Sequence, residues 1–287
     1  MNFYKYHGLG NDYIVMNPRE VARQPDAKQI RRICHRNYGI GSDGILWGPL
    51  SGPNQPFGVK IYNPDGSEAE KSGNGLRIFA RYLLDCALVA ETPFVISTIG
   101  GEVTAQVSGG GRSVSVKMGQ VSFDSRKIPV EGPPREVLNE RLDIGGTEVV
   151  FCAATIGNPH CVILEDVLDI GKVKNLGPKI ENHPVFPNRT NVQFATVVNS
   201  ARIDIEIWER GAGYTLASGS SASATAAVVH RLGLCGNHVS VHMPGGTLDI
   251  TIAKDYAVTM SGPVTRIGQG SLDTEMFDHE EPNQAAL

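Results

Sequence analysis

Two Ser-Gly pairs hold the residues of this sequence that are best placed for chemistry on an anion. Ser72-Gly73 and Ser218-Gly219 each stand directly before a run with helical character. The first N–H groups of a helix have no partner inside the helix, and they form the positive end of its dipole. A hydroxyl and small residues at such a point predict a carboxylate-binding site. Serine is also among the best N-cap residues, so the pattern leaves a purely structural cap equally open.

The spacing of the two pairs indicates an internal repeat. The pairs lie 146 residues apart (218 − 72), and three other segments recur in the same order at nearly the same offset. These segments are 10–15 with 157–162, 59–63 with 205–209, and 99–103 with 244–248. Single matches arise by chance because Gly-rich turns are common, but four in order indicate duplication. The sequence predicts two homologous halves, residues 1–118 together with 265–287, and residues 119–264.

Each half contains the elements needed to position its serine. Alternating, strand-like segments precede each Ser-Gly pair, and apolar helical runs over 76–83 and 222–232 follow it. A hairpin comes next in each half, with turns at 109–111 and near 254–255. We therefore expect an α/β fold in which each half brings a helix N-terminus to its site.

Composition excludes several classes of function. The net charge of −4 provides no basic footprint for nucleic acid. No apolar run approaches the roughly 18 residues that a membrane helix needs, and the start lacks a signal-peptide pattern, so we expect a cytoplasmic protein without membrane contact. The five cysteines form no CxxC pair and the eight histidines are scattered along the chain, which argues against a disulfide framework or a metal site.

A set of short motifs, taken in order and spacing, resembles diaminopimelate epimerase from Met1 to about Ile267. The motifs are His7-Gly8-Leu9-Gly10-Asn11-Asp12, Gly39-Ile40-Gly41-Ser42-Asp43-Gly44, Asn63-Pro64-Asp65-Gly66-Ser67-Glu68, Gly73-Asn74-Gly75 with Arg77, Gly157-Asn158-Pro159-His160, Asn191-Val192-Gln193-Phe194 and Glu209-Arg210-Gly211. The resemblance implies two pseudo-symmetric α/β domains, each a mixed sheet wrapped around a central helix, with the active site in the cleft between them.

The resemblance also implies a set of site residues. In that family two cysteines act as thiolate base and thiol acid on opposite faces of the α-carbon, without pyridoxal phosphate or metal. The matching positions here are Ser72 and Ser218, and His160 and Glu209 would partner the acid/base residues. The distal groups of the substrate would be bound by Asn11, Asn63, Asn158, Asn191 and Arg210, and its reacting carboxylate by backbone N–H groups of Gly73, Asn74, Gly219 and Ser220.

Several of these residues also have an ordinary structural interpretation. His160 fits a packed strand histidine, and Arg210 with Glu209 fits a surface pair of little energetic value. Asn158 and Asn191 fit turn residues that bond their own backbone.

The activity implied is conversion of LL-2,6-diaminoheptanedioate to the meso form, a step in lysine and peptidoglycan precursor synthesis, with a small amino acid as the partner and no cofactor. A serine hydroxyl ionises far above the thiol pKa of about 8.5, so serine is a poor base unless another group takes its proton. An isomerase or lyase acting on a related amino acid and a non-catalytic amino-acid binder therefore stay open, as does a homodimer. Tyr214 and Ser221 also depart from the family's usual residues, which favours a natural branch over two introduced substitutions.

Overall fold

The computed structural model describes residues 1–21, 23–50 and 56–278, and its chain forms two compact units. Unit 1 comprises Met1–Val114 and Val264–Leu287, and unit 2 comprises Ser115–Pro263. The chain enters unit 2 inside strand β9 (Ser113–Gln120), where the Ser115 hydroxyl lies 2.8 Å from that of Ser261 on β18 (Ala257–Gly262). The boundary expected from sequence lay at residue 118, within the same strand. Residues 279–287 of the expected C-terminal segment lie outside the described residues.

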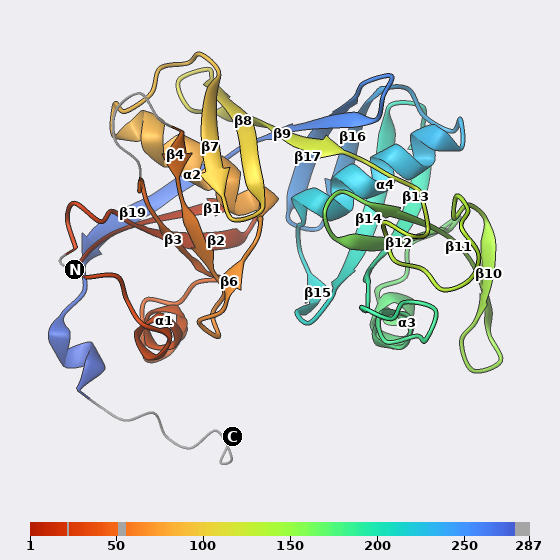
Figure 1. Cartoon of the computed structure of the whole chain (residues 1–287), viewed down its shortest axis with the longest axis horizontal. Helices are drawn as coiled ribbons and strands as arrows, with labels where there is room; N and C mark the ends of the chain where they lie inside the picture. Colours follow the sequence, from red (N-terminus) through yellow and green to blue (C-terminus); the bar gives the residue numbers. More distant parts are fainter. Residues whose placement is uncertain (22, 51–55, 279–287) are drawn as a thin grey trace. The chain divides into compact units, whose positions relative to one another are not determined.

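Unit 1 is built around helix α2 (Gly73–Asp85), which packs against β1, β2 and β8 (Figure 1). Its main sheet runs, in order, β19 (Thr265–Ser271), β1 (Asn2–Gly8), β2 (Asn11–Met16), β3 (Ile45–Trp47), β5 (Lys60–Tyr62) and β6 (Glu68–Ala69). A second set of strands comprises β4 (Phe57–Gly58), β7 (Phe94–Thr98) and β8 (Gly101–Ser108). The apolar residues Leu76, Phe79 and Leu83 are fully buried, as expected for a helix enclosed by strands. Helix α1 (Ala27–Cys34) and the short helix η1 (Thr274–Phe277) complete the described part of the unit.

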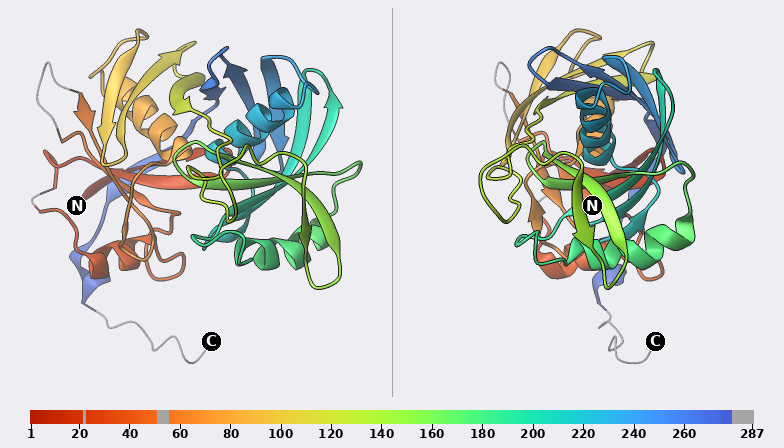
Figure 2. Two further views of the ribbon diagram at one scale, coloured as in Figure 1. Left: turned by 45° about the vertical axis from the view of Figure 1, so that its right-hand side comes forward. Right: turned by 90° about the vertical axis from the view of Figure 1, so that its right-hand side faces the viewer.

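Unit 2 repeats this plan around helix α4 (Gly219–Arg231), seen surrounded by strands in the right-hand view of Figure 2. Its strands run β10 (Glu140–Asp143), β11 (Glu148–Thr155), β12 (Pro159–Leu164), β13 (Asn191–Asn199), β14 (Arg202–Glu209), β16 (His238–Met243), β17 (Gly246–Ile252), β18 and β9, and β15 (Gly213–Thr215) pairs with β14. Most of the α4 core positions are alanine or valine, and these small side chains allow close approach of the strands around the helix.

The strand pairings confirm the internal repeat. The antiparallel pair β1–β2 corresponds to β11–β12, and the next pairing in each unit is parallel, β2–β3 and β12–β13. Antiparallel pairing follows, β3–β5 and β13–β14, and the helix of each unit then leads to an antiparallel pair, β7–β8 and β16–β17. The two predicted helical runs lie in α2 and α4, and the turn predicted near 254–255 connects β17 to β18. The duplicated α/β fold is therefore correct.

Helix α3 (Ile170–Glu181) contacts β13, β14 and β15 of unit 2. It approaches β14 at Gly177, where a Cβ atom would lie 2.6 Å from the Trp208 ring, so a larger residue has no room there. This close packing brings the end of α3 to the end of β14, where Glu209 and Arg210 are found. Across the described ranges, no helix is long and apolar enough to span a membrane.

Candidate active site

Ser72 is the N-cap residue of α2. Its backbone is extended (φ −134°, ψ 118°), and its Oγ accepts a hydrogen bond from the Gly75 N–H at 3.1 Å. A Cβ atom at Gly75 would lie 3.2 Å from the Ser72 Oγ, so glycine permits this tight first turn. The Tyr13 hydroxyl lies 3.1 Å from the same Oγ, in an arrangement that allows either oxygen to donate. Ser72 is thus both a cap and a partner of a second hydroxyl.

Ser218 holds the matching position at the start of α4. Its backbone is again extended (φ −146°, ψ 123°), and its Oγ accepts from the Ser221 N–H at 3.4 Å. Ser221 stands where unit 1 has glycine, and its buried hydroxyl accepts from the Gln193 Nε2 at 3.0 Å. The extra hydroxyl is therefore satisfied inside unit 2, which explains how the helix tolerates this departure.

Both helix N-termini have the electrostatics of an anion site. Neither α2 nor α4 has an acidic residue in its first turn. The serine hydroxyls cap the third N–H of each helix, while the N–H groups of Gly73, Gly219 and Ser220 precede the intrahelical hydrogen-bond ladder. A carboxylate at either point gains the dipole interaction as well as these donors. The cap interpretation and the site interpretation are therefore compatible.

A polar chain in unit 1 brings together Asn11 and Asn74, two of the predicted substrate-binding residues. Arg77 donates from Nη2 to the Asn74 Oδ1 (2.7 Å), Asn74 donates from Nδ2 to the Asn11 Oδ1 (3.1 Å), and Asn11 donates from Nδ2 to the Asp43 Oδ2 (2.8 Å). Arginine can only donate and an ionised carboxylate can only accept, so the two ends fix the orientation of both amides. Burial lowers the pKa of Arg77 to about 10, which keeps it charged near neutral pH.

Asn63 is placed separately, in the turn before β6. Its Nδ2 donates to the Ser67 hydroxyl at 3.0 Å, and its backbone N–H donates to the Ser67 carbonyl at 2.9 Å. These contacts hold the turn closed.

A corresponding chain in unit 2 connects His160 to Ser218. The His160 Nε2 lies 2.9 Å from the Asn158 Oδ1, Asn158 donates from Nδ2 to the Ser220 Oγ (3.4 Å), and Ser220 Oγ lies 3.5 Å from the Ser218 Oγ. The Asn158–Ser220 contact repeats the Asn11–Asn74 contact of unit 1, because each pair is offset by about 146 residues. His160 is thus a packed strand histidine that also belongs to the predicted site.

Burial keeps His160 neutral. Its side chain is fully buried, and burial lowers its pKa to about 3. An unfolded histidine takes up a proton near pH 6.5, so the unfolded state binds more protons between these two values. The contribution of His160 to stability is therefore complete above about pH 6.5 and is lost as the pH falls towards 3.

Replacing His160 should make the protein less sensitive to acid. The unfolding free energy is measured in urea at pH 7 and at pH 4.5. We expect its decrease between the two pH values to be about 2 kcal/mol smaller in His160→Gln than in the parent. Each pH unit between the folded and unfolded pKa values of His160 changes the unfolding free energy by about 1.36 kcal/mol. His238 is exposed, so His238→Gln serves as the matched control and should retain the parent's pH slope. Identical slopes in all three proteins would contradict a depressed pKa at His160.

Asn191 connects the start of β12 to the turn that follows β14. Its Oδ1 accepts from the Arg210 N–H (3.0 Å), and its Nδ2 donates to the Pro159 carbonyl (2.9 Å). It is a buried strand residue, so the turn interpretation is wrong for Asn191. The exposed Arg210 donates from Nη1 to the Asn188 carbonyl at 3.0 Å. Asn191 and Arg210 are therefore held together in unit 2, and Asn191 is also fixed to the residue that follows Asn158.

Glu181 anchors the turn that carries Arg210, and sequence reasoning missed it. Its Oε1 accepts from the Gly211 N–H (2.9 Å) and from Arg189 (3.1 Å), while its Oε2 accepts from the Trp208 indole N–H (2.8 Å). The residue is 5% exposed. No local pattern indicates this role, because Glu181 ends a helix and two of its partners, Trp208 and Gly211, lie 27 and 30 residues further along the chain.

Removing this carboxylate should destabilise unit 2. We expect Glu181→Ala to lower the unfolding free energy by about 3 kcal/mol, because buried donors then lose their acceptor. The matched control is Glu148→Ala, which removes an exposed pair with Arg141 and should cost less than about 1 kcal/mol. The measurement is urea denaturation at pH 7, and similar losses in the two variants would contradict the anchoring role.

Tyr214 is accommodated by partners in its own unit. Its hydroxyl donates to the Glu206 Oε2 at 2.7 Å, and the Lys174 ammonium lies 5.0 Å from the centre of its ring. Burial and the Glu206 carboxylate raise the pKa of Tyr214 to about 12. The residue therefore remains a neutral hydrogen-bond donor to Glu206 at neutral pH.

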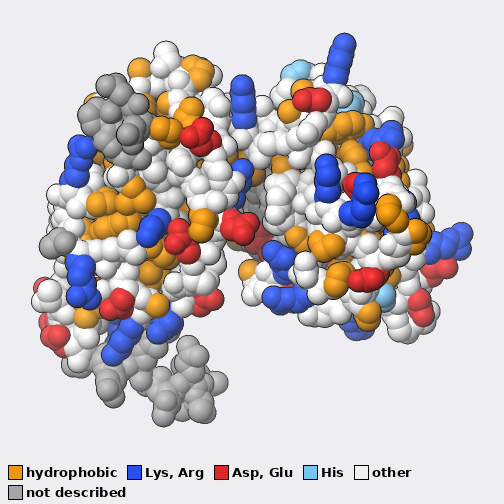
Figure 3. Space-filling view, in the orientation of Figure 1, with side chains coloured by type: hydrophobic (Ala, Val, Ile, Leu, Met, Phe, Trp, Pro, Cys, Tyr) orange, Lys and Arg blue, Asp and Glu red, His pale blue; other side chains and the backbone are white. Residues whose placement is uncertain are grey.

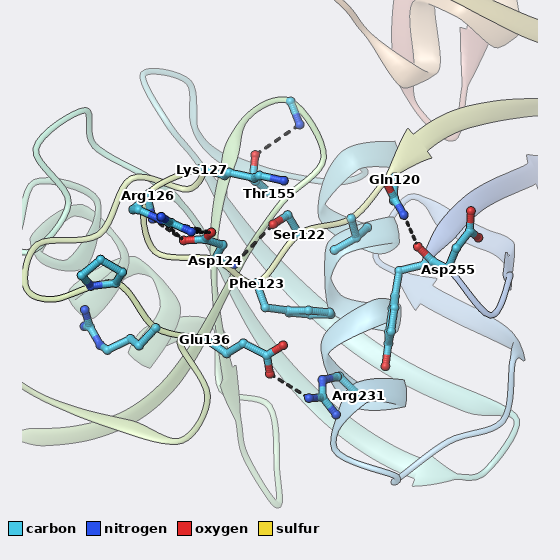
Figure 4. Close-up of a pocket in the computed structure, with 15 residues that line it drawn as sticks. Gln120, Ser122, Phe123, Asp124, Arg126, Lys127, Glu136, Thr155, Arg231 and Asp255 are labelled. Atoms are coloured by element: carbon cyan, nitrogen blue, oxygen red, sulfur yellow. Dashed lines mark hydrogen bonds and ion pairs between the residues drawn. The ribbon is translucent and has the colours of Figure 1, made fainter.

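A cavity of about 870 Å³ in unit 2 lies around Phe123 and Tyr256 (Figure 4). Its basic side chains include Arg126 and Arg231, which already pair with Asp124 and Glu136 at 2.6 and 2.8 Å. Basic and acidic side chains are likewise interspersed on the face of unit 2 drawn in Figure 3. None of the predicted site residues lines this cavity, and its paired charges are poorly suited to holding an anionic amino acid.

Comparison with known proteins identifies the family. The diaminopimelate epimerase family model matches residues 3–123 and 152–267. The chain is 56% identical over 277 residues to diaminopimelate epimerase 2 of Nostoc sp., covering 96% of this chain and 97% of that protein. It is 38% identical over 282 residues to the diaminopimelate epimerase of Desulfitobacterium hafniense, covering 95% of this chain and 98% of that protein.

Solved structures share the fold at low sequence identity. A probable proline racemase from Agrobacterium radiobacter has a TM-score of 0.71 at 15% identity, covering 96% of this chain and 94% of that one. A phenazine biosynthesis protein of the PhzF family from Bacillus anthracis has a TM-score of 0.66 at 13% identity, covering 94% and 98%. At such identities these structures show the fold alone. The family match, the sequence relatives and the duplicated helix-capped fold together show that the chain belongs to the diaminopimelate epimerase family.

Proposed function

We propose that this protein converts LL-2,6-diaminoheptanedioate to the meso form by removing a proton from one face of the α-carbon and returning one to the other. The observation that carries the proposal is the repeated serine-capped helix N-terminus, present at matching positions of two homologous units. The names of the sequence relatives support the choice of substrate. The proposed reaction uses neither pyridoxal phosphate nor a metal.

In this proposal each unit contributes one acid/base group and part of the substrate grip. Ser72 and Ser218 act on opposite faces of the α-carbon, and the reacting carboxylate binds the N–H groups at the two helix N-termini. Those N–H groups belong to Gly73, Asn74, Gly219 and Ser220. The distal amino and carboxylate groups bind Asn11, Asn63, Asn158, Asn191 and Arg210.

His160 and Glu209 assist the acid/base residues in the same proposal. His160 is neutral at physiological pH, and it reaches Ser218 through Asn158 and Ser220. An amide does not pass a proton along readily, so this chain supports a role for His160 in orienting the hydroxyls of Ser218 and Ser220. Glu209 ends β14, directly before the turn that Glu181 holds.

The serine pair sets the chemical difficulty of the reaction. A thiol at a helix N-terminus ionises near neutral pH, whereas a serine hydroxyl starts far higher, and each pKa unit of mismatch is about 1.36 kcal/mol. We therefore propose slow turnover. A non-catalytic amino-acid binder is the second candidate, because the N–H groups at the two helix N-termini can hold a carboxylate without any thiol.

The test is to incubate the purified protein with LL-diaminopimelate and separate the stereoisomers over time. The proposal expects the meso isomer to accumulate, and no accumulation with the double variant Ser72→Ala, Ser218→Ala. Saturable binding with no meso isomer would support the binder instead. Release of ammonia with formation of an unsaturated product would support a lyase, and either result would overturn the epimerase proposal.

We also propose a cytoplasmic location. All five cysteines are unpaired, four of them buried, and reduced thiols are typical of that compartment.

A further inference from the structure

Tyr13 lies beside the predicted acid/base residue of unit 1, and neither the motifs nor the proposed function gives it a role. It belongs to β2, its side chain is 7% exposed, and its hydroxyl lies 3.1 Å from the Ser72 Oγ. Ser72 Oγ also accepts the Gly75 N–H at 3.1 Å, which fixes the direction of the serine side chain. The two hydroxyls are therefore held within hydrogen-bond distance by a strand and by a helix N-terminus.

The position of the Tyr13 ring is determined by its surroundings. A Cβ atom at Gly44 would lie 2.6 Å from the ring carbon Cε1, and 2.5 Å from the Tyr62 carbonyl oxygen. The backbone at Gly44 is held against β2 by the hydrogen bond from the Ile14 N–H to its carbonyl, at 3.1 Å. The absence of a side chain at Gly44 thus creates the space that the ring fills.

The internal repeat gives Tyr13 and His160 equivalent positions in the two units. The motif from Gly10 to Tyr13 matches the motif from Gly157 to His160, at the offset of 147 (160 − 13). Both residues lie on the second strand of an antiparallel pair, β2 and β12, and that strand pairs in parallel with the next one in each unit. Each unit therefore has a side chain with an exchangeable proton at the equivalent strand position. Tyr13 contacts its serine directly, whereas His160 reaches Ser218 through Asn158 and Ser220.

We propose that Tyr13 is the proton-relay partner of Ser72, acting through that serine on the α-carbon. When Ser72 takes the α-hydrogen as a proton, the bond from carbon to hydrogen breaks and its electron pair stays on carbon. The serine hydroxyl passes its own proton to the Tyr13 phenolate, so serine remains neutral and tyrosine becomes a phenol. In the opposite direction Ser72 protonates the carbanion and Tyr13 returns a proton to Ser72. The inference rests on the proposed epimerase function.

The relay lowers the pKa of the group that finally accepts the proton, compared with a serine acting alone. Phenols ordinarily ionise near pH 10, much closer to the thiol value of about 8.5 than an aliphatic hydroxyl is. With a relay, the proton ends on the phenol and no serine alkoxide has to accumulate.

A double-mutant cycle separates a relay from a structural role. The four proteins are the parent, Tyr13→Phe, Ser72→Cys, and the variant with both changes. Tyr13→Phe removes only the hydroxyl, so the ring still fills the space at Gly44. In the parent background we expect kcat for epimerisation to fall at least about tenfold with KM within about twofold, because proton transfer is lost and binding is not. In the Ser72→Cys background the same change should alter kcat less than about threefold, since a thiol needs no phenol.

Each outcome has one meaning. Equal losses in both backgrounds, or no loss in either, would overturn the relay while the epimerase proposal stands. A parent without epimerisation would overturn the proposed function and the relay with it. Melting temperatures of all four proteins are measured alongside, and a loss of kcat that follows a loss of stability in both backgrounds also counts against the relay.

Discussion

The double variant Ser72→Cys, Ser218→Cys should exchange the α-hydrogen of diaminopimelate at least about a hundredfold faster than the parent. Both serines cap helix N-termini without acidic residues in the first turn, which is the environment that lowers a thiol pKa from about 8.5 towards neutrality. The substitution adds that ionisable group and leaves the backbone N–H donors in place. The measurement is deuterium incorporation into the substrate in heavy water.

The single variants provide the control for this prediction. A reaction that uses one group on each face needs both, so Ser72→Cys or Ser218→Cys alone should give much smaller gains. If the double variant binds diaminopimelate as the parent does but exchanges no faster, then the missing thiols do not limit the chemistry. Tyr214 and Ser221 would then be the first residues to examine for a site adapted to another reaction.

Replacing Arg210 by alanine should weaken diaminopimelate binding about a hundredfold, while a monocarboxylate amino acid of similar size loses less than about threefold. A guanidinium holds a carboxylate through two parallel hydrogen bonds, a geometry that the monocarboxylate cannot use at its distal end. Arg210 is exposed, and its backbone N–H donates to the Asn191 Oδ1, which fixes the backbone position from which the side chain extends. Calorimetric titration of both ligands gives the two ratios.

Arg202 is the matched control for this measurement. It begins the same strand, β14, and its guanidinium pairs with Asp204 at 2.8 Å. Arg202→Ala should therefore leave both affinities unchanged. Equal losses for the two ligands in Arg210→Ala would show that Arg210 does not recognise the distal carboxylate.

The features that were predictable from sequence are those carried by repeated local patterns. Ser72 and Ser218 stand before apolar runs of helical period, and the same strand and turn signals surround both, so duplication and the helix N-termini followed directly. The residue at which the chain passes from unit 1 to unit 2 was less predictable, because strand β9 continues through that boundary without any change of composition.

The contacts that support these residues depend on segments far apart in the sequence, and no local pattern specifies them. Glu181 meets Gly211 only because α3 packs on β14 at Gly177. Arg77 lies in an apolar helical run, yet its guanidinium sets the orientation of Asn74. The sequence around Tyr13 indicates only an ordinary buried strand residue, and its contact with Ser72 is seen only in the folded structure.

If two serine-capped helix N-termini epimerise diaminopimelate, the α-hydrogen of the substrate must exchange with solvent as the isomer changes. The experiment is to incubate the parent protein with LL-diaminopimelate in heavy water and to follow the α-hydrogen signal and the isomer ratio together. We predict that deuterium enters the α-position as the meso isomer forms, and that the variant Ser72→Ala, Ser218→Ala shows neither change. Tight binding of the substrate with an undiminished α-hydrogen signal and an unchanged isomer ratio would contradict the claim.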